Sequence, residues 1–307
     1  MSRAHHDHDH DHGHADAKHR ENRLLLAFAL TSLMLIAEAI GGLVSGSLAL
    51  LADAGHMLVD AGALLFAWLG ARYAKRPADA LRTFGYGRLE VLVGYSNALL
   101  QFVLVAWIAS EAIVRFAHPA PILSGTMLLV ALAGLGVNAI VLATLTHEHG
   151  DLNTAAARLH VLGDLLGSLG AVAAALLVRY LDALQADPLV SIGVSLLILG
   201  SAWRLLRRSA HILLEGTPEG IDADLVGTTI AHEAIGVREV HHVHIWQLAS
   251  GSHVATLHAR ALEGYPPDQV IVSIRTLLRE RFSVSHATVQ LETAPCSEPG
   301  CGTSAAA

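Results

Sequence analysis

Two short pairs of side chains could together hold a metal ion. The first pair is His56 and Asp60 in the segment LADAGHMLVDAG, and the second is His160 and Asp164 in RLHVLGDLLG. Residues four apart lie on the same face of a helix, so each helix can present one imidazole and one carboxylate to a common point. Two such helices would supply two nitrogens and two oxygens, a set suited to a four-coordinate Zn²⁺.

This ligand set leaves two questions open. Imidazole with carboxylate suits zinc and several neighbouring divalent metals, so the set does not by itself single out zinc. A lone histidine or aspartate in a membrane helix can also simply bond a neighbouring helix. Two matching pairs are harder to explain in that way, because a carboxylate at bilayer depth costs roughly 2.5 kcal/mol or more.

The elements that position these pairs are predicted membrane spans. Of the 307 residues, 53% are hydrophobic and only 15% are charged, whereas about a quarter of a soluble domain is charged. A span needs about 20 mostly apolar residues. An all-α transmembrane domain over 23–208 is therefore predicted, with a bundle of six helices at 24–44, 50–71, 88–113, 122–145, 157–179 and 187–206. The chain has no basic stripe with interleaved aromatic residues, so nucleic acid is not an expected partner.

Basic residues predict the orientation of the spans, because loops rich in Lys and Arg stay in the cytoplasm. One side of the predicted bundle carries most of them: Arg3, Lys18, Arg20, Arg23, Arg72, Lys75, Arg76, Arg82, Arg88, Arg158, Arg204, Arg207 and Arg208. The other side carries Arg115 and Arg179. Both termini are therefore predicted to face the cytoplasm.

The segment 209–293 has a different pattern, typical of a small cytoplasmic α+β domain. TPEGIDADLVGTTIAHEAI and PPDQVIVSIRTLLRERF read as helices, and REVHHVHIWQL, HVATLHARAL and HATVQLET read as strands. The order α-β-β-α-β predicts helices on one face of a three-stranded sheet. If the first strand is regular, His242 and His244 lie on one face and His241 on the other.

Several stretches of this chain resemble the cation diffusion facilitator family, most closely its bacterial zinc exporters. The resemblance covers the chain from about Asn22 to Glu292 and rests on SGSLALLADAGHMLVD, RTFGYGRLEVL, LHVLGDLLGS and HHVHIWQL. It implies a homodimer of six-span protomers in the bacterial inner membrane, with metallochaperone-like cytoplasmic domains. It also implies proton-coupled export of Zn²⁺, with Cd²⁺ or Co²⁺ as further cargo, and no enzyme activity or cofactor. Carried over, the transport site is the same two His-Asp pairs.

The resemblance implies further metal ligands outside the spans. Members with a cytoplasmic zinc site suggest His241, His258, His286 and Glu292 as ligands of a possible regulatory ion. Some members carry an Asp/His site in the loop between spans two and three, but here that loop offers Asp79 and no histidine.

Other polar residues do not enter the predicted transport site. Glu38 is expected to face the bundle interior, and Asp53 to have a gating or structural role. The predicted tail 1–22 contains a histidine-rich run that could collect zinc: His5, His6, His8, His10, His12, His14 and His19. His147 and His149 form a smaller cluster, and Cys296 and Cys301, in the predicted tail 294–307, form a weak metal pair.

Proton exchange would follow from the chemistry of the ligands. Metal ligands must be deprotonated, so the site would hold either a metal ion or protons. Two alternatives remain, an intramembrane metalloenzyme and a membrane metal sensor. The spans contain no H-E-x-x-H motif of a membrane metalloprotease, and the short soluble part has no recognisable DNA-binding or kinase motif.

Overall fold

A computed structural model describes residues 29–74, 78–146, 152–249 and 251–294. The chain forms two compact units. The first contains residues up to 62 together with 99–202, and the second contains 63–98 together with the residues from 203 onward. The division falls inside three long helices, and each unit is described here by itself.

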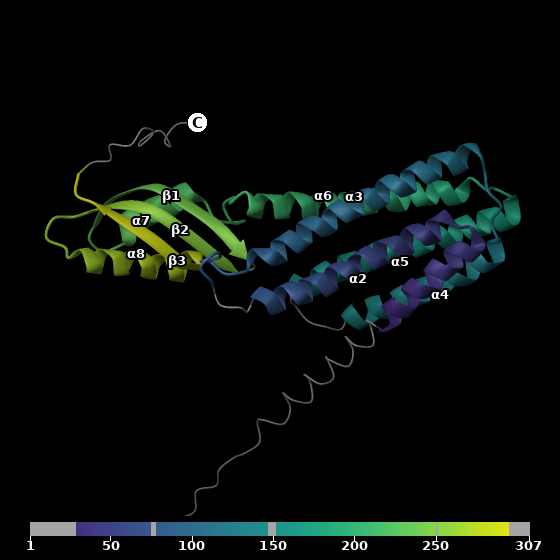
Figure 1. The fold of residues 1–307 in the computed structure, drawn as a ribbon, viewed down its shortest axis with the longest axis horizontal. Coiled ribbons are helices and arrows are strands. Elements are labelled where there is room, and N and C mark those ends of the chain that lie inside the picture. The colour runs from purple at the N-terminus through teal and green to yellow at the C-terminus, as the bar shows by residue number, and fades with distance from the viewer. Residues whose placement is uncertain (1–28, 75–77, 147–151, 250, 295–307) are drawn as a thin grey trace, which may run out of the picture. The chain divides into compact units, whose positions relative to one another are not determined.

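Five of the described helices are long and apolar enough to cross a membrane. They are α2 (Leu48–Ala74), α3 (Arg88–Ala117), α4 (Ser124–Thr146), α5 (Leu152–Leu181) and α6 (Ala186–Leu213) (Figure 1). A shorter apolar helix, Ala29–Ser45, precedes them. It corresponds to the first predicted span, 24–44, whose first five positions lie outside the described residues.

Small residues allow the helices of the first unit to pack closely. A Cβ atom added at Gly41 would lie 2.6 Å from the side chain of Val130, and one added at Gly170 would lie 3.0 Å from Val190. A large buried cluster in this unit is correspondingly rich in alanine. Close backbone approach through small residues is the usual way in which membrane helices gain packing energy, because lipid tails are as apolar as the helices themselves.

The start of α2 is fixed by a buried carboxylate from the start of α6. Asp187 accepts hydrogen bonds from the backbone N–H groups of Leu48, at 2.7 Å, and Ala49, at 3.2 Å, and from the hydroxyl of Ser47 at 2.6 Å. The first N–H groups of a helix have no partner within the helix, and a carboxylate there also interacts favourably with the helix dipole. Asp187 therefore sets the position of α2, the helix that carries His56.

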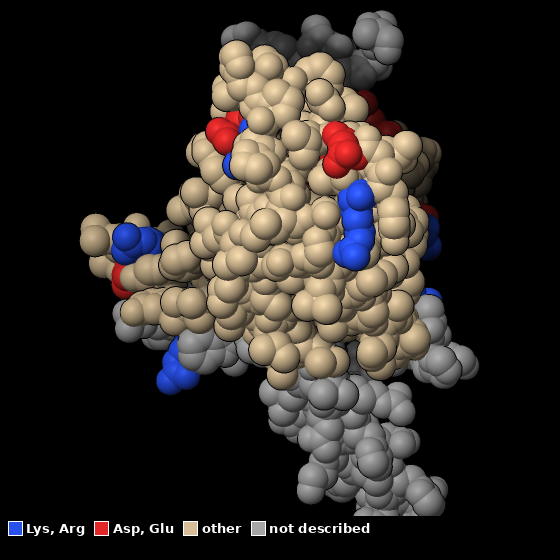
Figure 2. All heavy atoms as spheres, turned by 90° about the vertical axis from the view of Figure 1, so that its right-hand side faces the viewer, with Lys and Arg blue, Asp and Glu red and all other residues tan. Residues whose placement is uncertain are grey.

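The surface agrees with a position in lipid. Figure 2 looks onto the right-hand end of the molecule in Figure 1, where Lys, Arg, Asp and Glu form separate patches in a described surface made mostly of other residues. Large apolar side chains such as Val103, Leu129 and Leu196 are exposed. Exposed apolar area on this scale is rare in a soluble monomer, so these side chains are expected to face lipid or a second copy of the chain.

The second unit contains the predicted α+β domain. Helix α7 (Ala223–Glu233) is followed by strands β1 (Val237–Ala249) and β2 (Ser252–Ala261), helix α8 (Pro267–Phe282) and strand β3 (Val284–Glu292) (Figure 1). The sheet order is β1-β2-β3, with β1 and β2 antiparallel and β2 and β3 parallel. Both helices pack against the same side of the sheet and against each other. The predicted order and layering are confirmed.

Local signals explain where the two helices of this domain begin and how they pack. Asp222 is the N-cap of α7 and accepts hydrogen bonds from the backbone N–H groups of Asp224 and Leu225. Pro267 begins α8, where its missing N–H is not needed. The apolar faces of both helices meet alternate residues of the strands in one core: Val226, Ile230, Val270, Ile274, Leu278, Ala255, Leu257 and Ala259.

The prediction that successive side chains of β1 alternate between the two faces of the sheet is wrong at His242. His241 pairs with His258, but three residues later His244 pairs with Thr256, so β1 contains one extra residue, a β-bulge. His242 occupies this bulge with a φ of 50°, a left-handed conformation that is uncommon for residues other than glycine. The bulge lets Val240 and Val243, three positions apart, both pack toward the helices. The three-residue spacing of these two valines was the feature of the sequence that could have indicated the bulge.

Candidate functional site

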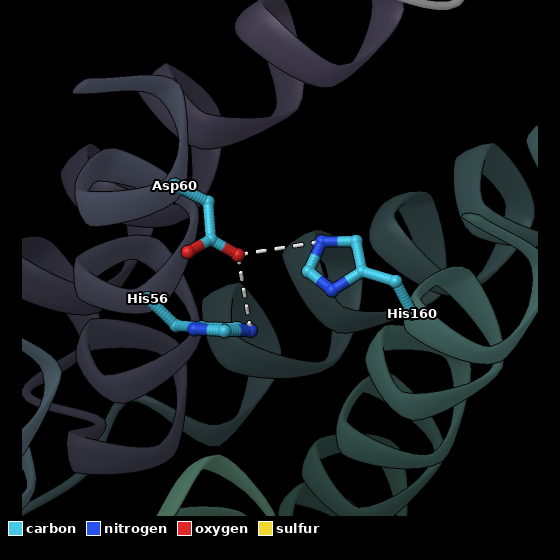
Figure 3. Close-up of side chains that lie close together, drawn as sticks. All are labelled: His56, Asp60 and His160. Carbon is cyan, nitrogen blue, oxygen red and sulfur yellow. Dashed lines mark ion pairs between the residues drawn. The ribbon is translucent and has the colours of Figure 1, made fainter. Parts of the chain in front are cut away.

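The structure brings the two predicted His-Asp pairs together inside the first unit. His56 and Asp60 come from α2 and His160 from α5, and one ligand atom from each lies within 4.8 Å of the others (Figure 3). The Oδ2 atom of Asp60 lies 3.4 Å from Nε2 of His160 and 3.6 Å from Nε2 of His56. Both imidazole rings therefore direct Nε2 toward the same carboxylate oxygen.

Asp164 completes the group from the α5 side. Its Oδ2 lies 3.8 Å from Nε2 of His160, and its Oδ1 lies 3.9 Å from Nε2 of His56. The exposed fraction of the side chain is 10% for His56 and 49% for His160. His56 is thus enclosed, whereas the side chain of His160 is half-exposed.

The spacing of these donors suits one small cation. In a tetrahedral zinc site with bonds near 2.0–2.1 Å, neighbouring ligand atoms are roughly 3.3 Å apart. The four N–O separations in this group run from 3.4 to 3.9 Å. Small side-chain movements would be needed for His56, Asp60 and His160 to bind one ion. Asp164 would have to move further, because it faces the two histidines through different oxygens and its ligand atoms do not all lie within 4.8 Å of the other three residues.

Glu38 and Asp53 lie in the same unit but are not members of the group. Glu38 is 1% exposed, which agrees with the predicted interior position. Its carboxylate lies so close to α4 that a Cβ atom at Gly134 would be 2.7 Å from Oε1. Asp53 is also buried, next to Gly167 of α5. Nothing described assigns a gating role to Asp53.

A second His-carboxylate group lies on the face of the sheet opposite to helices α7 and α8. Glu292 of β3 places Oε2 3.0 Å from Nε2 of His241 and Oε1 2.9 Å from Nδ1 of His258. The ring of His242 is 5.4 Å from that of His241 and 5.2 Å from that of His258, centroid to centroid. The bulge thus adds to this group a histidine that the sequence interpretation had placed on the opposite face from His241.

The charges of this group act on Glu292. Its partial desolvation raises the pKa, but the imidazoles of His241 and His258 and a hydrogen bond from the amide of Gln290 outweigh that effect. The net result is that the pKa of Glu292 lies below its usual range. The carboxylate therefore stays ionised at any physiological pH and is available to bind a cation.

The structure does not bring His286 to this group. Its ring packs edge to face against Phe84, with the ring centroids 5.9 Å apart. His286 and Glu292 are six residues apart on β3, a separation of about 20 Å at the rise of a strand. His286 and Glu292 lie on the same face of β3, but within one protomer they are too far apart to bind the same ion.

The loop between α2 and α3 uses its one carboxylate for local structure. Asp79 accepts a hydrogen bond from the hydroxyl of Tyr86 and from the backbone N–H groups of Leu81 and Arg82. The bond from Tyr86 and then that from Arg82 lower the pKa of Asp79. These contacts suit a carboxylate that stabilises a turn.

Several predicted ligands lie outside the described residues. They are the histidines of the N-terminal run, His147, His149, Cys296 and Cys301. Their possible metal binding stays a prediction.

Comparisons with known proteins decide the family. A family profile described as the cation efflux transmembrane domain matches residues 24–214, which is more than half of the chain. The chain belongs to the cation efflux family. A second profile, the cytoplasmic domain of cation efflux proteins, matches residues 218–294. The predicted resemblance to cation diffusion facilitators is therefore confirmed.

Relatives match across nearly the whole chain. A zinc transporter ZitB from Pectobacterium atrosepticum is 46% identical over 91% of this chain and 88% of its own length. The metal cation efflux system protein CzcD of Cupriavidus metallidurans is 39% identical over 91% and 88%. A cadmium, cobalt and zinc/H⁺-K⁺ antiporter of Bacillus velezensis is 37% identical over 88% of each chain.

Membership of the family settles several expectations. Cation efflux proteins are transporters, so this protein is a multi-pass membrane transporter and not an enzyme. The match to the dimer-forming cytoplasmic domain supports the predicted homodimer.

Proposed function

We propose that this protein exports Zn²⁺ from the cytoplasm in exchange for protons, with Cd²⁺ or Co²⁺ as further cargo. In this proposal His56, Asp60, His160 and Asp164 bind the transported ion. The observation that carries it is the convergence of two imidazole nitrogens and two carboxylates from α2 and α5, with N–O separations of 3.4 to 3.9 Å. The names of the relatives, which include zinc transporters and a zinc antiporter, support the choice of ion.

The same four residues provide the coupling to protons. Imidazole has an ordinary pKa near 6.5, so it changes charge within the range of pH that cells maintain. Metal binding requires neutral imidazoles and ionised carboxylates, and therefore releases protons from the site. A site that opens alternately to the two sides of the membrane would bind zinc at the cytoplasmic pH and release it where the pH is lower.

The placement of the chain in its membrane is part of the proposal. The excess of Lys and Arg in one set of loops supports cytoplasmic termini, in the inner membrane of a bacterium. The transmembrane domain would then cover 23–208 and the cytoplasmic domain 209–293, between tails 1–22 and 294–307.

A regulatory role is proposed for the group on the sheet. His241, His258 and Glu292 would bind a second Zn²⁺ that is not transported. Their ligand atoms lie within 4.8 Å of one another and belong to all three strands. An ion held there would link the strands and report the cytoplasmic zinc concentration.

Zinc uptake into everted membrane vesicles tests the proposal. In such vesicles the cytoplasmic face is outside, so an acid interior should drive zinc inward. Collapse of the pH gradient with a protonophore should reduce the initial rate by tenfold or more. Vesicles that contain Asp60→Ala give the matched background. Uptake that ignores the imposed gradient would argue against proton exchange.

A further inference from the structure

Gln101 is a polar residue in an otherwise apolar stretch of α3, ALLQFVLVAWI. Its exposed fraction is 4%, and its side-chain Nε2 donates a hydrogen bond of 2.6 Å to Oδ1 of Asp60. Because an ionised carboxylate only accepts hydrogen bonds, the amide nitrogen must face it. Hydrogen bonds to a charged acceptor are shorter and stronger than neutral ones, so this contact belongs to the strong class.

The two oxygens of Asp60 consequently have different partners. Oδ2 faces both imidazoles, and in Figure 3 the two dashed lines run from this single oxygen. Oδ1 is the acceptor for Gln101. A carboxylate oxygen has two lone pairs, so Oδ1 could still contact a metal. A strong hydrogen bond from Gln101 nevertheless makes Oδ1 a weaker ligand and holds it toward α3, so binding through Oδ2 alone is favoured over binding through both oxygens.

We propose that Gln101 is a positioning residue that sets the metal preference of the transport site by holding Asp60 as a one-oxygen ligand. This inference rests on the proposed function of the four ligands. With Asp60 limited to one oxygen, the group supplies few donors and suits the four-coordinate geometry of zinc. Mn²⁺ prefers six ligands, most of them oxygen atoms. Its affinity would therefore increase most if Asp60 bound through both oxygens.

The chemistry of an amide fits this task better than a charged group would. A Lys or Arg at this position would also donate to Oδ1, but its charge would weaken the attraction of the site for a cation. A Glu would add a third carboxylate and could itself bind the metal. The neutral amide orients Asp60 and leaves the charge of the site unchanged. Outer partners of this kind typically change metal affinity by 10–100-fold when removed.

The test is a comparison of zinc and manganese in purified full-length protein reconstituted in liposomes. The KM for Zn²⁺ and the inhibition constant of Mn²⁺ against zinc uptake are measured for the wild type and for Gln101→Leu. We expect the KM for Zn²⁺ to rise by about 10–100-fold. Inhibition by Mn²⁺ should weaken much less or strengthen, so that the preference for zinc over manganese falls by about tenfold or more.

Asn138→Leu is the matched control. Asn138 is another buried amide in the same unit, and it donates a hydrogen bond of 3.1 Å to the hydroxyl of Ser168. Its replacement removes one interhelical hydrogen bond but leaves the carboxylates of the group untouched. We expect the control to keep the wild-type preference between the two metals, even where its stability falls.

A second variant keeps the test decisive if Gln101→Leu does not fold. Gln101→Glu preserves the size of the side chain but replaces the donor with a carboxylate, so it should also lower the zinc preference. If the Gln101 variants weaken the binding of both metals equally, or behave like Asn138→Leu, then Gln101 only joins α3 to α2.

Failure of the inference can be distinguished from failure of the proposed function. Wild-type protein that transports no zinc, or Asp164→Ala protein that transports it normally, would overturn the four-ligand site itself. If the wild type and Asp164→Ala behave as expected while both Gln101 variants keep the wild-type metal preference, only the role of Gln101 is overturned.

Discussion

The two His-carboxylate groups of this protein are built in different ways. In the membrane group, each helix supplies a histidine and an aspartate four residues apart, and the N–O separations are 3.4 to 3.9 Å. In the soluble group, three strands each supply one ligand, and the separations are 2.9 and 3.0 Å. The first spacing is close to that of the ligands around a four-coordinate zinc ion, roughly 3.3 Å. The second consists of direct contacts between the side chains, which would have to widen slightly to admit an ion of the same size.

The largest expected effect is a difference in zinc transport between variants of the two groups. Asp164→Ala removes a carboxylate from the membrane group and should reduce zinc flux in proteoliposomes by 100-fold or more, because an ion would face too few charged ligands. Glu292→Ala, its counterpart in the soluble group, should reduce flux far less, because Glu292 does not bind the transported ion and the membrane group stays intact. Equal loss in both variants would remove the distinction between a transport group and a regulatory group.

A smaller effect concerns the choice of ion in the membrane group. His56→Asp replaces a nitrogen ligand with an oxygen ligand, and oxygen-rich sites favour Mn²⁺ over Zn²⁺. We expect the ratio of zinc to manganese uptake to fall by about tenfold. The same ratio measured with His241→Asp should stay at the wild-type value, and a change there would connect the soluble group directly to selectivity.

Glu292 of the soluble group should contribute to the dependence of stability on pH at the acid end. The pKa of Glu292 is lowered in the folded protein, so its contribution to stability is complete above the unfolded pKa, near 4.3. The contribution is lost as the pH falls through the lower folded pKa. In metal-free protein, the difference in Tm between the wild type and Glu292→Gln should therefore shrink as the pH drops below about 4.3. A constant difference down to pH 2 would contradict the direction of the shift.

The smallest expected effect tests the bulge in β1. His242 has a φ of 50°, and a left-handed conformation costs roughly 1–2 kcal/mol for residues other than glycine. His242→Val should destabilise the protein by about 1 kcal/mol, because β-branched residues tolerate this conformation poorly. His242→Gly should relieve the strain, although it also removes the imidazole. Chemical denaturation of metal-free protein measures both changes, and His244→Val controls for the loss of a histidine on the same strand.

Apolar composition and local periodicity made most of the fold predictable. The apolar runs predicted α2 to α6, and the pattern of helices and strands predicted the α-β-β-α-β domain. Both signals depend only on neighbours along the chain, since a helix repeats every 3.6 residues and a strand every two. The predicted alternation failed at His242 because the packing of Val240 and Val243 against the helices outweighed the regular pattern. His286 was implied by the resemblance to family members with a cytoplasmic zinc site, but it lies six residues from Glu292 on β3, about 20 Å away.

The sequence by itself determined which side chains share a helix face, and so it placed His56 with Asp60 and His160 with Asp164. It could not determine which oxygen of Asp60 faces the imidazoles, or that Gln101 bonds the other. Those contacts join helices that are far apart in sequence, and their geometry depends on how the helices pack. Tertiary structure alone therefore decided how Asp60 is oriented, because orientation is a property of neighbours in space and not of spacing along the chain.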